Sequence, residues 1–344
     1  MNNRKNINIL LFVSLIILLF GLFTADLLLG SVKIPVNDIF LALRGKSSEI
    51  YNQIILEFRL PKAITAIVAG IALSVCGLQM QTIFRNPLAG PDVLGINAGA
   101  SLGVALLVLG FSSFFANSIF TVTGAWSIVI MAWIGSGAVL LLILLISVRV
   151  RDIMTILILG ILFSGAVSSL VSVLQYFSNE SMLKSFVIWT MGSLGGVTST
   201  QLKVLIPSLI IGLFISFFMI KQLDVIMLGE KYSLSSGVNV QIVRALIFIS
   251  TSIMAGSVTA FCGPIAFIGV AVPHLSRMIF KTSSHIILLP ATILIGSVTM
   301  LLSDIISQLP GLNITLPINA ITSILGVPVI IWIIFKNKRM EKIF

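Results

Sequence analysis

The sequence predicts an all-α membrane protein with about ten transmembrane helices. Of its 344 residues, 58% are hydrophobic and only 9% are charged, whereas a soluble domain has roughly 25% charged residues. Apolar runs long enough to span a bilayer, about 20 residues each, recur along the whole chain. Only short polar segments separate them. We therefore expect residues 1–344 to form a single polytopic membrane domain.

The first apolar run, 8–30, follows a polar start that carries Arg4 and Lys5. It is longer than the roughly 7–15 apolar residues of a signal peptide, and no small-residue cleavage site follows it. We therefore expect a first transmembrane helix that starts in the cytoplasm.

Eight further runs have spanning length, and one shorter stretch completes the set. The long runs are 62–84, 94–111, 123–148, 152–176, 203–220, 244–263, 286–308 and 318–335. The stretch 264–280 is shorter and contains proline, but counting it as a span places both termini in the cytoplasm. Fourteen of the 21 Lys and Arg residues then lie on the cytoplasmic side and seven outside. Such an excess is typical of membrane proteins.

The formal net charge of +10 raises the alternative of a nucleic-acid-binding protein. The basic residues are scattered between apolar runs, and no basic patch interleaved with aromatic residues is present. We therefore expect lipid bilayer, and no nucleic acid, as the chain's surroundings.

One internal repeat relates 67–77 to 253–263, with five identical residues in eleven aligned positions. In the expected topology the first copy runs inward and the second outward. Inverted repeats of this kind are common in transporters. The alternative is a chance match between segments rich in small and apolar residues.

An unusual segment, 85–95, interrupts the apolar background after the second expected span. Pro87 and Pro91 prevent a regular helix there, and irregular backbone at membrane depth must be covered by protein or line a water-filled cavity. Gly95, Gly99 and Gly103 follow at a spacing that allows close helix packing. We expect a covered, non-helical break at the cytoplasmic end of the span. A tight turn before a packed helix is the simpler alternative.

Two polar segments are too long for simple loops. Residues 178–200 begin with a pattern typical of a short amphipathic helix at the outer surface. Residues 221–243 form the longest polar segment expected in the cytoplasm.

Few residues suggest chemistry. Asp304 lies inside a late span, and an intramembrane carboxylate points to function, although its place near the outer end also allows partial solvation. His274 has no nearby carboxylate, whereas a metal site needs three or four ligands; a histidine at a cytoplasmic helix end is the better interpretation. No G-x-x-x-x-G-K-[ST] phosphate loop occurs. We therefore expect neither an enzyme nor a bound cofactor or metal.

Several motifs occur together in a characteristic order, and they cover the chain from about 55 to 335. They are Arg59-Leu60-Pro61-Lys62, Arg85-Asn86-Pro87-Leu88-Ala89-Gly90-Pro91-Asp92-Val93-Leu94-Gly95, Met191–Gly196, Leu228-Gly229-Glu230, Gly263–Gly269, Pro273-His274-Leu275-Ser276-Arg277 and Gly326-Val327-Pro328. In this order they resemble the FecCD family, the ten-helix permeases of type II ABC importers for iron-siderophores, haem and vitamin B12.

This resemblance implies a location in the cytoplasmic membrane and a set of partners. Two permease subunits, identical or sister chains, would enclose the pathway. Two cytoplasmic ATPase subunits would drive transport, and an extracytoplasmic binding protein would deliver the cargo. A ferric siderophore is the first expectation for that cargo, with haem and cobalamin as alternatives. The rival from another class is a secondary transporter driven by an ion gradient.

The resemblance also implies roles for individual residues. Residues 221–243 match the family's ATPase-coupling segment, with Gly229, Glu230, Ser233 and Gly237 as the matching positions; Ser233 and Ser236 depart from the usual Ala and Leu. Arg59 and Lys62 match basic positions that meet acids of the binding protein. Gln308 and Thr315 stand where the family has a basic residue and a glutamate. The structural motif positions are Asn86, Pro87, Pro91, Gly95, Gly99, Pro273, His274 and Arg277.

Overall fold

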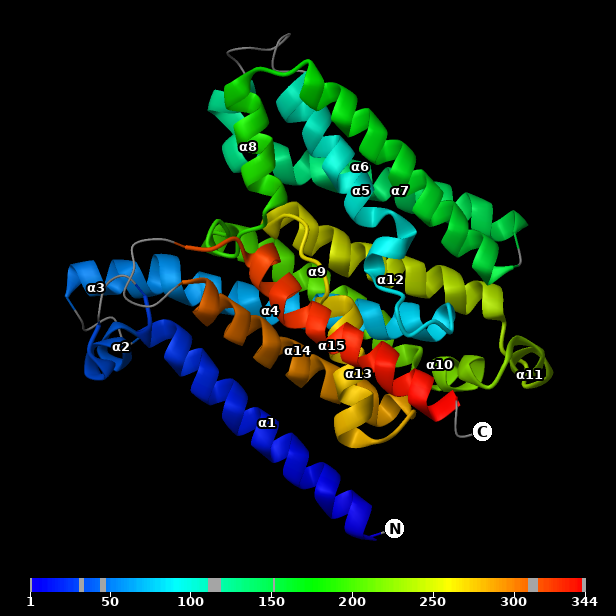
Figure 1. The fold of residues 1–344 in the computed structure, drawn as a ribbon. Coiled ribbons are helices and arrows are strands. Elements are labelled where there is room, and N and C mark those ends of the chain that lie inside the picture. Colours follow the sequence, from blue (N-terminus) through cyan, green and yellow to red (C-terminus); the bar gives the residue numbers. More distant parts are fainter. Residues whose placement is uncertain are drawn as a thin grey trace. The chain divides into compact units, whose positions relative to one another are not determined.

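The computed structural model describes residues 2–30, 34–43, 48–110, 119–150, 152–308 and 315–341. Over these residues every regular element is a helix, which confirms the predicted all-α class (Figure 1). The chain divides into two compact units. Unit 1 comprises Met1–Leu78, Ser193–Val204 and Ile265–Phe344, and unit 2 comprises Gln79–Gly192 and Leu205–Pro264. The expectation of one polytopic domain stays a prediction.

Unit 1 is built around α1, α4 and the last three helices. Its elements are α1 (Asn2–Leu28), α2 (Val36–Leu43), α3 (Glu49–Gln53), η1 (Ile54–Arg59), most of α4 (Leu60–Ile83), α13 (Ile268–Phe280), α14 (His285–Ser307) and α15 (Ile318–Glu341). Helix α1 lies along α14, and α14 also contacts α13 and α15 (Figure 1).

Unit 2 contains the end of α4 and the middle of the chain. Its elements are η2 (Pro91–Leu94), α5 (Ile96–Ala105), η3 (Leu106–Gly110), α6 (Ile119–Arg149), α7 (Ile153–Tyr176), α8 (Glu180–Thr190), most of α9 (Ser199–Phe218), α10 (Ile220–Met227), α11 (Glu230–Ser235) and α12 (Val240–Cys262). Helix α5 packs against α6 and α7, and α12 packs against α6. The rings of Phe84 and Phe248 stack in its core with centroids 6.1 Å apart.

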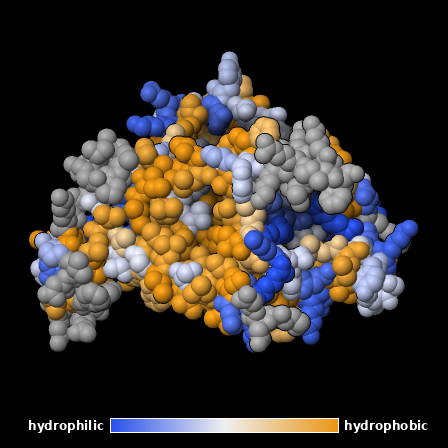
Figure 2. All heavy atoms as spheres, turned by 60° about the horizontal axis from the view of Figure 1, so that its bottom comes forward, coloured by the Kyte–Doolittle hydropathy of each residue, from blue (hydrophilic) through white to orange (hydrophobic). Residues whose placement is uncertain are grey.

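Seven described helices are long and apolar enough to cross a membrane, and three shorter apolar helices accompany them: Ile96–Gly110, Ile268–Phe280 and Ile318–Trp332. Each overlaps a stretch that was expected to span. The helix Glu49–Ile83 starts 13 residues before the expected run 62–84, so the expectation of a loop up to residue 60 was wrong. Figure 2 shows apolar side chains over much of one face. The number of crossings and the side of the termini stay predictions. Of the basic residues used for that topology, Lys33, Arg44, Lys46, Arg151 and Lys342 lie outside the described residues.

The predicted break after α4 is present. The helix ends at Ile83, residues 86–90 are not helical, and a short 3₁₀ turn leads to Gly95, whose φ of 73° suits glycine. The Asn86 side chain closes the turn by accepting a hydrogen bond from the Leu88 amide, at 2.9 Å. The cover is partial, because Pro91 is buried whereas Leu88 is exposed.

Glycines set the helix contacts on both sides of this break. A Cβ on Gly99 would collide with the Gly135 carbonyl and the Val139 side chain, and one on Gly103 would collide with the Met131 carbonyl. The predicted close packing after the break is therefore the contact between α5 and α6. Close approach at small residues is a main source of helix association in lipid.

The two copies of the internal repeat lie in α4 and at the end of α12, and the last glycine of each copy approaches a backbone carbonyl. In unit 1, Gly70 meets the Gly296 carbonyl and Gly77 meets the Gly269 carbonyl. In unit 2, the equivalent Gly263 meets the Trp189 carbonyl. This shared packing supports a structural repeat, while its inverted orientation stays a prediction.

The motif Pro273–Arg277 lies inside α13, which falls within the expected span 264–280. The helix starts at Ile268 and continues to Phe280, and Arg277 lies in its last turn. That His274 stands at a cytoplasmic helix end stays a prediction. Pro273 lacks an amide hydrogen and cannot bond the Gly269 carbonyl four residues back. That carbonyl is the one against which Gly77 packs, so the proline occupies a place where the helix contacts α4.

Replacing Gly99 with Leu should lower the yield of folded, monodisperse protein extracted from membranes. The new side chain would overlap the α6 backbone, and overpacking costs about 1–3 kcal/mol or more. Gly137→Leu in α6 is the control, because a Cβ on Gly137 meets nothing within 4 Å. Equal yields from the two variants would show that the Gly99 contact is incidental.

Candidate functional site

Helices α10 and α11 form a helical hairpin within the polar segment 221–243. Helix α10 ends at Met227, Gly229 turns the chain with a φ of 126°, and α11 follows. The buried Ser233 holds the turn, because its hydroxyl donates to the Gly229 carbonyl at 2.7 Å and approaches the Val225 carbonyl at 3.2 Å. The departure of Ser233 from the usual alanine thus adds a bond within the hairpin.

Two arginines attach this hairpin to helix ends of unit 2. The Arg85 side chain, at the start of the break, donates to the Ile226 carbonyl at the end of α10, at 2.9 Å. The Arg244 guanidinium lies 3.9 Å from the Glu230 carboxylate of α11. Arg244 is only 3% exposed, and the hairpin is therefore anchored both to the break and to α12.

A third helix end lies within reach of the Arg244 charge. Asp152 caps α7 by accepting hydrogen bonds from the Thr155 amide at 2.9 Å and the Thr155 hydroxyl at 2.6 Å. These bonds hold the pKa of the Asp152 carboxyl below its usual range, and the Arg244 charge adds to the shift. Arg244 therefore sits electrostatically between the hairpin and the start of α7.

A hollow of about 450 Å³ opens beside the hairpin. It is lined by Glu230, Leu234, Gly237, Val238, Asn239, Val240, Gln241 and Arg244. Around it Leu228, Tyr232 and Leu234 expose more than half of their surface. Exposed apolar and aromatic side chains around a concave, charged centre are typical of a protein-binding surface.

A second polar cluster joins α1, α4 and α14 in unit 1. The Lys62 ammonium lies 3.0 Å from the Asp304 carboxylate. The Gln308 amide donates to Asp304 at 3.1 Å and to Asp26 at 2.7 Å. Both aspartates are almost fully buried. Arg59 binds the end of α1, because its guanidinium donates to the carbonyls of Leu27 at 2.7 Å and Leu28 at 3.0 Å.

This charged cluster connects residues that the sequence analysis had kept apart. Lys62 was expected at a docking surface and Asp304 in a pathway, and the structure pairs them. Arg59 caps a helix end, where a cation interacts favourably with the free carbonyls. Asp26 was missed, although an acid inside the first apolar run marks it. Gln308, which replaces a basic residue of the family, bridges the two carboxylates.

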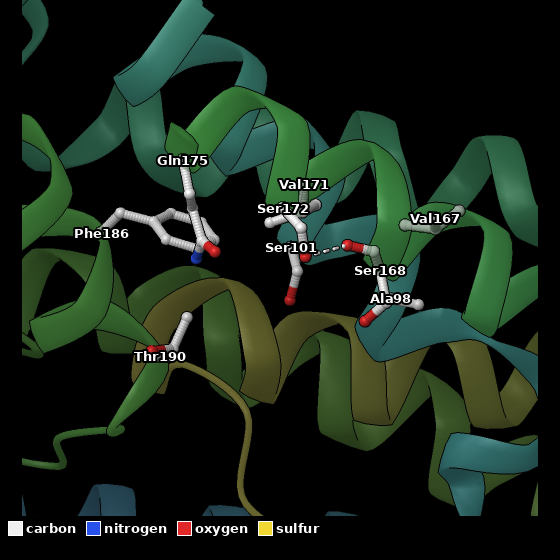
Figure 3. A pocket seen from close by; sticks show the side chains of 9 residues that line it. All are labelled: Ala98, Ser101, Val167, Ser168, Val171, Ser172, Gln175, Phe186 and Thr190. Carbon is white, nitrogen blue, oxygen red and sulfur yellow. Dashed lines mark hydrogen bonds between the residues drawn. The ribbon is translucent and has the colours of Figure 1, made fainter. Parts of the chain in front are cut away.

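A third feature is a pocket of about 240 Å³ in unit 2, between α5, α7 and α8 (Figure 3). Its lining residues are Ala98, Ser101, Val167, Ser168, Val171, Ser172, Gln175, Phe186 and Thr190. More than half of them carry a hydroxyl or amide, and none is charged. Sequence analysis missed this pocket because its residues come from three separate segments.

Three further motif positions expected from the sequence lie on α13. His274 and Arg277 are half-buried on α13, and Pro273 is buried. Among the residues that the structure describes, no group of three His, Cys, Asp or Glu side chains is arranged to hold a metal ion.

Comparison with known proteins agrees with this architecture. Residues 15–336 match the FecCD transport family. The chain is similar to the hemin transport system permease protein HmuU of Yersinia pestis, with 31% identity over 99% of both chains. It is also similar to the vitamin B12 import system permease protein BtuC of Salmonella typhi, with 32% identity over 98% of this chain and 97% of that one.

A solved structure is similar over almost the same length. It is described as an inward-facing conformation of a metal-chelate type ABC transporter, and it matches with a TM-score of 0.82 and 28% identity. The match covers 95% of this chain and 99% of that chain.

The charged pair in unit 1 should respond to mutation as a buried pair. Lys62→Met leaves the Asp304 charge buried without its cation, which costs about 3–5 kcal/mol. We expect the thermal unfolding midpoint in detergent to fall by several degrees, and Lys62→Met combined with Asp304→Leu to recover most of the loss.

Lys203→Met is the control, because Lys203 is exposed on α9 and belongs to the same unit. If Lys62→Met unfolded at the same temperature as this control, the pair would contribute nothing to stability.

Proposed function

Because the chain belongs to the FecCD transport family and is a permease subunit of an ABC importer, we propose that its cargo is a ferric siderophore. The observation that carries this proposal is the similarity, over 95% of the chain, to a metal-chelate type transporter. A siderophore complex is a metal chelate that arrives already coordinated, so the pathway needs no metal ligands of its own. Haem and cobalamin, the cargoes named for HmuU and BtuC, are the alternatives.

We propose that the α10–α11 hairpin is the surface on which a cytoplasmic ATPase docks. Its exposed apolar side chains and the hollow beside them fit a partner protein better than solvent. Glu230 is half-exposed at the rim, where it can meet a partner, while its contact with Arg244 keeps it in register with α12. Gly229 and Gly237 provide the turns at the two ends of α11, with φ of 126° and 78°.

The same contacts supply a route from the ATPase to the span ends. A displacement of α11 would pull on Arg244 through Glu230 and on the break through the Arg85 bond to α10. Because Arg244 also interacts with the cap of α7, a shift of the hairpin would reach three helix ends together. We propose that this linkage converts ATP hydrolysis into a change of the pathway.

Docking of a binding protein through Arg59 and Lys62 is the less direct part of the proposal. Both cations have partners inside unit 1. An acidic residue of the binding protein would have to add to these contacts or exchange with Asp304. This arrangement supports docking that depends on shape as well as charge. We propose separately that a second permease subunit completes the pathway, as the family membership implies.

The rival function, ion-coupled secondary transport, finds less support. Such transporters usually carry clustered intramembrane acids or histidines that bind the coupling ion. Asp304 and Asp26 are clustered, yet Lys62, Gln308 and Arg59 surround them at the ends of α1 and α14. That arrangement is better suited to fastening helices than to releasing an ion.

Deleting the gene should abolish growth when a ferric siderophore is the sole iron source and should leave growth on ferrous salts unchanged. The intact gene, supplied again, should restore growth. Normal growth on the siderophores, with loss of growth on haem or loss of cobalamin uptake, would favour the alternatives.

Glu230→Lys should reduce stimulation of ATP hydrolysis by the loaded binding protein roughly tenfold, because it places two like charges side by side and reverses the charge that meets the ATPase. The protein should still insert in the membrane. Glu180→Lys makes the same change in the exposed first turn of α8, which belongs to the segment expected at the outer surface, and should have little effect. Unchanged stimulation in the Glu230 variant would argue against the hairpin as the docking surface.

A further inference from the structure

The pocket between α5, α7 and α8 has a one-sided polar lining that the coupling and docking roles do not explain. Ser168, Ser172 and Gln175 follow each other on α7 at helical spacing and therefore share one face. Ser101 of α5 and Thr190 of α8 face the same space, and Figure 3 shows these side chains pointing toward it. The buried Phe186 ring forms an apolar wall.

The hydrogen-bonding state of these groups is uneven. The Ser172 hydroxyl donates to the Ser168 carbonyl at 2.9 Å, and the Thr190 hydroxyl donates to the Val187 carbonyl at 2.7 Å. Each hydroxyl therefore donates its hydrogen bond within its own helix and presents only acceptor lone pairs to the pocket.

The other three polar side chains keep their full hydrogen-bonding capacity. Within the described part of the chain, the side chains of Ser101, Ser168 and Gln175 have no hydrogen-bond partner. Two hydroxyls and one amide can both donate and accept. Together with the acceptor oxygens of Ser172 and Thr190, they form a set of hydrogen-bond donors and acceptors that a ligand in the pocket would satisfy.

The place of this set is unusual for polar side chains. Helix α7 is long and apolar enough to span the membrane, and on it Ser168 and Ser172 are exposed and Gln175 is part-buried. Polar residues of membrane helices face the protein interior or a water-filled cavity and mark substrate pathways. The pocket is open, so a solute at this face of unit 2 can reach these groups.

The lining also selects the chemistry of the ligand. No lining side chain carries a charge, so a free carboxylate or an ammonium group would find no counter-ion. A neutral group that both donates and accepts hydrogen bonds, such as an amide that does not coordinate the metal, matches the free hydroxyls and the Gln175 amide. The volume of about 240 Å³ lies below the roughly 300–1,000 Å³ of sites that enclose a drug-sized ligand. The pocket therefore suits one arm of a larger molecule.

We propose that this pocket is a cargo subsite that holds one neutral, amide-bearing arm of the transported chelate. The inference rests on the proposed function and narrows it. A chelate whose arms carry free amide groups fits the subsite, whereas haem, whose polar groups are carboxylates, does not.

The test uses the complete importer, with its ATPase and binding protein, in proteoliposomes. The probes are a ferric trihydroxamate with amide bonds in its arms, cobalamin and haem. Ser168→Leu fills the pocket and Gln175→Leu removes the amide at nearly constant size. For the trihydroxamate, both should lower the cargo imported per ATP hydrolysed, by roughly threefold to tenfold, which corresponds to the loss of one or two hydrogen bonds. Stimulation of ATP hydrolysis by the binding protein should stay unchanged.

Ser169→Leu is the matched control, because Ser169 is exposed on α7, one residue away, and does not line the pocket. The subsite would be overturned if none of the three variants changed the import per ATP hydrolysed. It would also be overturned if all three lowered it equally. Failure of the unmodified importer to import any probe would overturn the proposed function itself, and import of haem alone would overturn the ligand class.

A second measurement does not depend on bulky substitutions. The thiol introduced by Ser168→Cys should react with a small maleimide, and trihydroxamate present during turnover should slow this reaction. Ser169→Cys should react at the same rate with and without cargo. The native Cys76 and Cys262 are buried and give little background. Equal protection, or none, at both positions would contradict the subsite.

Discussion

Close backbone contact at glycine is the constraint on which the rest of the structure depends. In lipid, apolar side chains gain little from contacting each other instead of lipid, so helices associate where small residues let their backbones meet. Gly70 and Gly296 provide such a contact in unit 1, and Gly99 and Gly135 provide one in unit 2. Gly160 of α7 brings that helix against the Val93 carbonyl of the break, so irregular backbone is covered by a neighbouring helix, as a bilayer demands.

The functional surfaces depend on this frame through a few polar contacts. The break positions Arg85, which holds the end of α10, and α12 positions Arg244 beside Glu230 and near the α7 cap. Buried arginine is costly unless acceptors surround it. Arg244 thus makes the geometry of the hairpin depend on helices that belong to the membrane-spanning part of unit 2.

Much of this arrangement could be predicted from the sequence, because the predictive features are local. Apolar run length indicated the helical stretches, Pro87 and Pro91 indicated the break, and the spacing of Gly99 and Gly103 indicated a close contact. Polarity between two apolar runs indicated that 221–243 is a segment of its own. The proline-containing stretch 264–280 was expected as a span, and α13 continues through Pro273 as one helix.

What could not be predicted are the pairings between distant segments. The partner of Lys62 is Asp304, on a helix more than 200 residues later, and Asp26 joins them from α1. The polar pocket gathers residues from α5, α7 and the amphipathic α8, three segments that are separate in the sequence. No local pattern records which of these hydroxyls will face each other.

The most direct test of an ATP-driven importer permease is the energy source of uptake. Proteoliposomes that contain this chain with its ATPase and binding protein should import a ferric chelate only when ATP is supplied on the cytoplasmic side. This uptake should persist when a protonophore and a sodium ionophore collapse all ion gradients. Uptake that needs no ATP and stops when the gradients collapse would contradict the account and would identify an ion-coupled transporter instead.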